Sequence, residues 1–228
     1  MELGSIPEHL TVVHLNDIDT SKMQLYRDDI YKRGVYTYYD DTVDQFVKIF
    51  KWPCNKHNYI YGELGLDLLH EGLISKFTQH LCPALSNVIV NDDNIITGYC
   101  TYRCPLAPWP GYYKQEPELQ ALPKVKEFTR RIEEYTIKYK VYHCDVTETN
   151  IVQLKNGQYS FIDLESILPV GLFDYYYKWF GTDRYENIIR QNTTQQDIKD
   201  IQHIINNKKF HTLETYCLKI PGINLKKK

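Results

Sequence analysis

The chain contains the stretch His143-Cys144-Asp145-Val146-Thr147-Glu148-Thr149-Asn150-Ile151-Val152, which is followed after eight residues by Phe161-Ile162-Asp163-Leu164-Glu165. Asp145 and Asn150 are five residues apart, and Asp163 comes eighteen residues after Asp145. Phosphoryl transfer uses such a set: a carboxylate that orients the attacking hydroxyl and accepts its proton, an amide oxygen that ligates a metal ion, and a second carboxylate that joins metal ions to phosphates. Mg²⁺ takes few ligands from protein, so one Asp and one Asn are sufficient. The two stretches therefore predict a site for a phosphoryl group and its magnesium.

The segments around these stretches predict elements that hold the polar residues in place. Strands are expected at 151–154 and 159–162, joined by a polar turn that contains Gly157. Upstream, apolar residues recur at steps of three and four, which predicts an amphipathic helix with the buried positions Val125, Phe128, Ile132, Tyr135 and Tyr139. Asp145 and Asn150 are thus expected on a loop between a helix and a hairpin.

The amino-terminal half predicts a small sheet and one helix. β-branched and aromatic residues separated by turn signals predict an antiparallel meander over residues 24–50 and a hairpin over 87–100. Apolar residues at helical spacing predict a helix within 62–81. Five prolines predict a linker at 105–123, and residues 172–218 are expected to be helical.

Composition limits the class of protein. The 228 residues carry a net charge of −2, with 43% apolar and 25% charged residues, which is typical of a globular chain. This balance argues against non-specific nucleic-acid binding, which needs an excess of Lys and Arg, and no sequence-specific binding is expected either. We expect no membrane span, no secretory signal in the acidic start, and a cytoplasmic protein whose six scattered cysteines are reduced.

The quoted residues follow the pattern H-x-D-x-x-x-x-N and then D-x-E, with both internal spacings kept. In this respect the chain resembles the protein-kinase-like superfamily, over about residues 25–180. The resemblance implies an α+β, two-lobed fold in a single domain covering residues 1–228. It places a small antiparallel-sheet N-lobe at about 23–104 and a reduced, mainly helical C-lobe at about 105–218.

The resemblance also implies the roles of the polar residues and the cofactors. Asp145 is the expected base or orienting group, and Asn150 and Asp163 are the expected ligands of Mg²⁺ or Mn²⁺. ATP is the expected phosphate donor. The residues that follow the second strand pair, Thr101 and Tyr102 through Cys104, are expected to form a hinge whose backbone hydrogen-bonds adenine.

The family requires a strand lysine that binds the α- and β-phosphates of ATP, and a helix glutamate that pairs with it. Lys48, within Phe46-Val47-Lys48-Ile49, is the expected lysine, and Lys51 is the alternative. Glu71 is the expected glutamate, and Glu63 is the weaker alternative.

The chain also departs from the family pattern. No G-x-G-x-x-G is present, and the segment where the phosphate-covering loop is expected contains one glycine, Gly34, preceded by Lys32 and Arg33. These basic side chains are candidates to supply charge there. Cys144 replaces the arginine that in regulated kinases binds a phosphorylated activation loop, and no A-P-E follows the metal-binding Asp163. The long activation segment is therefore expected to be missing.

These departures favour short, atypical kinases. The RIO-type kinases have a loop similar to Asp145-Val146-Thr147-Glu148-Thr149-Asn150, and choline and aminoglycoside phosphotransferases have an I-D-x-E element similar to Ile162-Asp163-Leu164-Glu165. Other short members are the lipopolysaccharide-core sugar kinases and the small kinase of the tRNA threonylcarbamoyl-modification complex.

The resemblance implies an enzyme that transfers the γ-phosphate of ATP to a hydroxyl group. A Ser or Thr of a protein is the favoured acceptor because of the RIO-like loop. A small molecule or sugar is the first alternative, because of the I-D-x-E element. A catalytically inactive pseudokinase scaffold that binds nucleotide or a protein partner is the second alternative.

Overall fold

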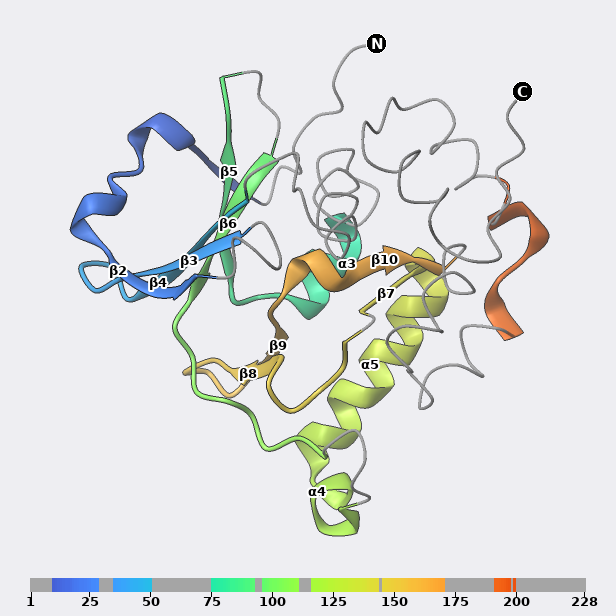
Figure 1. The fold of residues 1–228 in the computed structure, drawn as a ribbon. Coiled ribbons are helices and arrows are strands. Elements are labelled where there is room, and N and C mark those ends of the chain that lie inside the picture. The colour runs from blue at the N-terminus through green and yellow to red at the C-terminus, as the bar shows by residue number, and fades with distance from the viewer. Residues whose placement is uncertain are drawn as a thin grey trace.

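The fold is taken from a computed structural model, which describes residues 10–28, 35–50, 75–92, 96–110, 116–143, 145–170, 191–197 and 199. A sheet lies at one side of the molecule, and a long helix with two short strand pairs lies at the other (Figure 1). After β6 (Ile96–Tyr102) the chain leads past the β8–β9 hairpin (residues 151–161) toward α4 (Pro117–Ala121) (Figure 1). The described residues form an α+β fold, as predicted.

The larger sheet has six strands in the order β1-β5-β6-β4-β3-β2. Its strands are β1 (Thr11–His14), β2 (Gln24–Asp28), β3 (Val35–Asp40), β4 (Gln45–Phe50), β5 (Leu85–Val90) and β6 (Ile96–Tyr102). The predicted meander is confirmed, because β2, β3 and β4 are antiparallel neighbours. The predicted hairpin of β5 and β6 is also confirmed, and β6 joins the meander through β4.

The sheet is mixed, which corrects the prediction of an antiparallel one. β1 runs parallel to β5, with Thr11 opposite Asn87 and His14 opposite Val90. Residues 11–14 therefore contribute an edge strand, although the sequence predicts that the N-lobe begins at about 23. The prediction missed β1 because four residues are too few to show a period, and the partner strand lies 76 positions further along the chain.

Residues 15–23 cover the outer face of the sheet. They contain two short 3₁₀ turns, η1 (Leu15–Asp17) and η2 (Thr20–Lys22). Leu15, Ile18 and Met23 pack, together with Tyr38, on a buried cluster that consists of Val47, Ile49, Ile89 and Cys100. Burial raises the pKa of the Cys100 thiol to about 11, so this cysteine is a protonated part of the apolar cluster at neutral pH. The opposite, inner face of the sheet points toward the rest of the chain.

The remaining elements of the described residues are three helices, one 3₁₀ turn and four short strands. They are α3 (Ser75–Leu81), α4 (Pro117–Ala121), α5 (Pro123–Tyr139), β7 (Val141–His143), β8 (Ile151–Gln153), β9 (Tyr159–Phe161), η3 (Leu164–Ser166) and β10 (Ile167–Pro169). β8 and β9 form the predicted hairpin, and β7 pairs with β10.

Helix α5 confirms the predicted amphipathic helix. Its proline stands in the first turn, where the missing N–H has no helical partner to lose. Val125, Phe128 and Ile132 are buried, whereas Tyr135 and Tyr139 are partly buried against the same core. The helix ends at Lys140, which has φ 56° and ψ 34° in the left-handed region, and the chain then enters β7 directly.

The predicted linker at 105–123 is partly structured, which corrects the prediction. Pro117 begins α4, and Pro123 begins α5. Ahead of α4, Leu106 forms a bridge with Val152 of β8, and the N–H of Ala107 donates to the carbonyl of Ile151 at 2.9 Å. The prolines do not prevent these contacts, because helix starts and strand edges tolerate the missing N–H.

A single buried core connects the sheet to the helical part. From the inner face of the sheet it contains Val35, Phe50, Val88, Val90 and Tyr99. From the helical part it contains residues that include Phe128, Ile132, Ile151, Phe161 and Ile167. The sheet and the helical part therefore share one core, and α3 contacts both α5 and β9 within it.

Several predicted elements extend beyond the residues that the structure describes. Of the helix expected within 62–81, the last part is seen as α3, whereas residues 51–74 lie outside the described part of the chain. Of the helical region expected at 172–218, only 191–197 and 199 are described. In the described residues, no helix is long and apolar enough to cross a membrane.

Phe128 provides a test of this core. Its ring is 2% exposed and contacts the rings of Trp109, Tyr159 and Phe161 at centroid distances of 5.6, 5.7 and 5.2 Å. We predict that Phe128→Ala lowers the free energy of unfolding by about 3–5 kcal/mol, because it leaves a cavity. Urea denaturation measures this value. Ile137→Ala, on the same helix but 40% exposed, is the control and is expected to change stability by less than about 1 kcal/mol. Equal losses in the two variants would contradict the assigned core.

Candidate functional site

An ion pair joins the sheet to the turn that follows the hairpin. Lys48 of β4 contacts Asp163 through its Nζ and the carboxylate Oδ1, although 115 positions separate them in the sequence. Both side chains are largely buried, with 18% and 21% of their surface exposed. The structure therefore brings together two of the residues that the sequence proposed, from opposite sides of the molecule.

Lys48 reaches the inner face because side chains alternate along a strand. Val47 and Ile49 belong to the outer cluster, so Lys48 points to the opposite side. Its ammonium group lies 5.6 Å from the ring centroid of Tyr99, which is its partner residue on β6. Gly98 follows in the register, and a Cβ at this glycine would lie 2.3 Å from the carbonyl oxygen of Lys48. Glycine therefore permits the close pairing of β4 and β6 beside the lysine.

Asp163 stands at the turn between β9 and η3. Its φ of 59° and ψ of 58° lie in the left-handed region, which Asp tolerates better than most residues. Its carbonyl accepts the N–H of Ser166 at 2.9 Å, which closes the following 3₁₀ turn. An unusual backbone conformation at a polar residue is common at functional sites, where the surrounding structure enforces it.

Asp145 and Asn150 are in direct contact. The side-chain Nδ2 of Asn150 donates to the backbone carbonyl of Asp145 at 3.0 Å and to its carboxylate Oδ2 at 2.7 Å. Both partners are acceptors, so the amide nitrogen must face Asp145 and the amide oxygen must point elsewhere. The loop is closed by two further bonds, from the N–H of Thr147 to the carbonyl of Asp145 and from the N–H of Asn150 to the carbonyl of Thr147, each 3.0 Å long.

His143 joins this loop to the turn that contains Asp163. The N–H of Asp145 donates to Nδ1 of His143 at 3.2 Å. Because Nδ1 accepts, the proton of the neutral ring is on Nε2, which donates to the carbonyl of Ile162 at 2.8 Å. The ring is 2% exposed and stacks on Phe161 at a centroid distance of 4.4 Å. One imidazole thus bonds the backbone of Asp145 and the backbone of Ile162, which precedes Asp163.

The hairpin places the two proposed metal ligands near each other. Ile151 is paired with Phe161, and the N–H of Ile162 donates to the carbonyl of Asn150 at 3.0 Å. Asn150 enters β8 and Asp163 follows β9 after one residue, so both stand at the open end of the hairpin.

The donor set fits Mg²⁺ or Mn²⁺. The carboxylate of Asp163 and the amide oxygen of Asn150 are hard oxygen donors, as these cations prefer. The described residues contain no group of three or more His, Cys, Asp and Glu that would make a complete metal cage. Mg²⁺ in nucleotide sites takes one or two protein ligands together with phosphate oxygens.

The proposed hinge residues lie at the end of β6. Thr101 is buried opposite Phe46, and Tyr102 is half exposed. The N–H of Tyr102 donates to the carbonyl of Ala84 at 2.9 Å, and the N–H of Arg103 donates to the carbonyl of Asp44 at 3.0 Å. Both donors are therefore used within the protein.

Several proposed residues lie outside the described part of the chain. These are Lys32, Arg33, Gly34, Lys51, Glu63, Glu71 and Cys144. Glu165 belongs to η3, but its side chain is not described.

The sequence did not single out Tyr99 or Gly98 as neighbours of the lysine. Only the register of β4 against β6 places them there, and no local pattern reports the register. The sequence also did not predict that His143 bonds the backbone at both Asp145 and Ile162, although the family pattern contains this histidine. Its two partners become adjacent only when the hairpin forms.

Neither a protein-family model nor a curated protein matches this chain.

The role of His143 can be tested by stability. We predict that His143→Ala lowers the free energy of unfolding by about 2–4 kcal/mol, because it removes a buried stacked ring and the hydrogen-bond partners of the partly buried N–H of Asp145 and carbonyl of Ile162. Chemical denaturation followed by circular dichroism measures the loss. His14→Ala, at an exposed histidine of β1, is the matched control and is expected to cost less than about 0.5 kcal/mol. An equally small cost at His143 would contradict its role in joining the loop to the turn.

Proposed function

We propose that this protein is an ATP- and magnesium-dependent phosphotransferase that transfers the γ-phosphate of ATP to a hydroxyl group. The ion pair between Lys48 and Asp163 is the observation that carries the proposal. A phosphate clamp and a metal ligand must lie at the same phosphates, and these two side chains lie together although they come from opposite sides of the molecule.

The second support is the arrangement around Asp145. Its carboxylate is half-buried and forms no ion pair within the described residues. The amide nitrogen of Asn150 holds one of its carboxylate oxygens, which fixes the orientation of the group. A fixed carboxylate of this kind orients an acceptor hydroxyl and takes its proton as the new bond to phosphorus forms.

The remaining roles follow from the same contacts. Asn150 and Asp163 would hold the metal ion, which when bound neutralises charge on the transferred phosphoryl group. Lys48 would bind the α- and β-phosphates of ATP. Because Asp163 and the phosphates both attract Lys48, the lysine is expected to move from the carboxylate to the nucleotide when ATP and metal bind. Most of the rate enhancement in such a reaction comes from positioning and charge neutralisation.

The finer fold assignment is part of the proposal. A sheet that carries the lysine on its inner face and a helical part that carries Asp145, Asn150 and Asp163 are what a two-lobed kinase-like fold requires. The parallel strand β1 and the segment 15–23 that covers the outer face of the sheet would be additions to that fold.

A hydroxyl of a protein Ser or Thr is the proposed acceptor, on the similarity of the loop from Asp145 to Asn150 with RIO-type kinases. A radiolabelled ATP assay on a cell lysate, with protein and small-molecule fractions counted separately, distinguishes this acceptor from a small molecule or sugar. Label confined to the small-molecule fraction would contradict the protein acceptor.

Asp163 provides the test of the phosphotransferase. We predict that Asp163→Ala and Asp163→Asn lower ATP turnover by at least about 10²- to 10³-fold, because each removes a charge that the transition state requires. Asp41→Ala, at an exposed carboxylate of the β3–β4 turn, is the matched control and is expected to keep wild-type turnover. Circular dichroism verifies that each variant is folded.

The result separates the proposed enzyme from an inactive scaffold. Turnover by folded Asp163→Ala at the wild-type rate would contradict the proposal. Binding of Mg·ATP by the wild-type protein without any turnover would favour a pseudokinase.

A further inference from the structure

An aromatic cluster lies on the inner face of the sheet, on the same face as Lys48. Phe46 precedes Lys48 by two positions on β4, and alternation puts the two side chains on one face. The ring of Phe46 lies 5.0 Å from that of Tyr26 and 5.4 Å from that of Tyr39. We call Tyr26, Tyr39 and Phe46 the aromatic cluster.

The aromatic cluster is open to solvent. Tyr26 is 64% exposed, and the other two rings are half-buried. Apolar rings that are not covered by the protein are a common feature of surfaces that bind a ligand. Tyr26 comes from the position where the register between β2 and β3 shifts, and this irregularity turns its ring toward Phe46.

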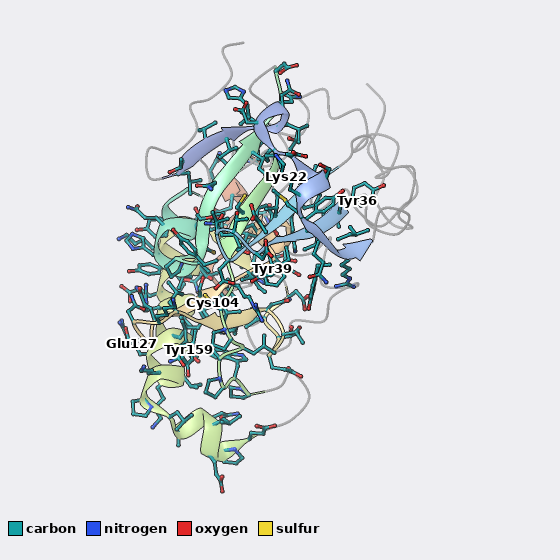
Figure 2. The ribbon with its side chains drawn as sticks, turned by 90° about the vertical axis from the view of Figure 1, so that its left-hand side faces the viewer. Lys22, Tyr36, Tyr39, Cys104, Glu127 and Tyr159 are labelled. Carbon is teal, nitrogen blue, oxygen red and sulfur yellow. The ribbon has the colours of Figure 1, made fainter. Side chains whose placement is uncertain are left out.

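Tyr39 of the aromatic cluster is also held in a fixed orientation. Tyr39 donates its hydroxyl proton to Asp44 Oδ1 at 2.8 Å and accepts a hydrogen bond from Nη1 of Arg103 at 3.0 Å. The guanidinium of Arg103 also lies 5.1 Å from the Tyr39 ring centroid. In the view of Figure 2, Cys104 of the connecting chain lies below Tyr39 of the sheet, and Tyr159 of β9 lies lower still. A ring fixed in this way loses little entropy when a ligand stacks on it.

The spacing between Phe46 and Lys48 matches the spacing between the base and the phosphates of a nucleotide. Two positions along a strand span about 7 Å, so Phe46 lies about one sugar unit from the lysine proposed to bind phosphate. Aromatic side chains stack on every nucleobase, because each base has a π-face. Few backbone donors are available to the edge of a base, because the N–H groups of Tyr102 and Arg103 already donate to carbonyls of the protein. The N–H of Cys104 forms no hydrogen bond within the described part of the chain.

We propose that the aromatic cluster binds the purine base of the nucleotide by its face, so that the site accepts GTP as well as ATP. This inference rests on the proposed phosphotransferase function. Recognition of a face does not distinguish adenine from guanine, and a single backbone donor changes affinity by no more than about tenfold.

Calorimetric titration with three probes tests the inference: Mg·AMP-PNP, Mg·GMP-PNP and Mg·tripolyphosphate. We predict that the wild-type protein binds the two nucleotides with dissociation constants within about tenfold of each other. Phe46→Leu keeps an apolar side chain but removes the π-face, and it is expected to weaken both nucleotides by about 5- to 150-fold. Phe46→Trp is expected to retain their affinity. Tripolyphosphate has no base, so its affinity is expected to stay the same in both variants.

Leu25→Ala is the matched control, because Leu25 is 49% exposed, precedes Tyr26 on β2 and is paired with the outward-facing Tyr38. It is expected to leave all three affinities unchanged. Wild-type nucleotide affinity in Phe46→Leu, or a preference for AMP-PNP above about 100-fold, would overturn this inference while the proposed function stands. Failure of the wild-type protein to bind any of the three probes would instead overturn the proposed function.

Discussion

The ion pair between Lys48 and Asp163 is the constraint on which the arrangement of the site depends. Each charge is largely removed from water, and a charge in such a place needs a partner of opposite sign. The lysine is carried by the sheet and the aspartate by the turn after the hairpin, so the pair holds only if both parts keep their relative position. The common apolar core provides this, because it contains residues from the inner face of the sheet and from α5, β8 and β9.

A second network keeps the loop from Asp145 to Asn150 in a fixed position relative to the same turn. His143 accepts the N–H of Asp145 and donates to the carbonyl of Ile162, and Asn150 donates to the carboxylate of Asp145. All of these partners belong to the loop or to the hairpin that follows it. The orientation of the proposed base and of the proposed metal ligands therefore depends on one short segment, whereas the distance to Lys48 depends on the whole core.

Elements whose sequence period is clear were predicted well. Helix α5 and the β8–β9 hairpin were expected from spacing and turn residues, because their contacts are mainly local. β1 and α4 were missed. β1 is too short for a period, and α4 occupies a proline-rich segment in which prolines begin helices and do not interrupt them. The parallel pairing of β1 with β5 joins distant segments, and no local signal reports such a pairing.

The sequence by itself determined which chemical groups are available: Lys48, Asp145, Asn150 and Asp163, with the spacing of the last three fixed by a loop and a hairpin that form locally. Only the tertiary structure decided that Lys48 meets Asp163, that Tyr99 lies beside the lysine, and that Tyr26, Tyr39 and Phe46 form an exposed cluster near it. The physical reason is that these contacts depend on strand register and on burial of a common core, and both are properties of the folded chain as a whole.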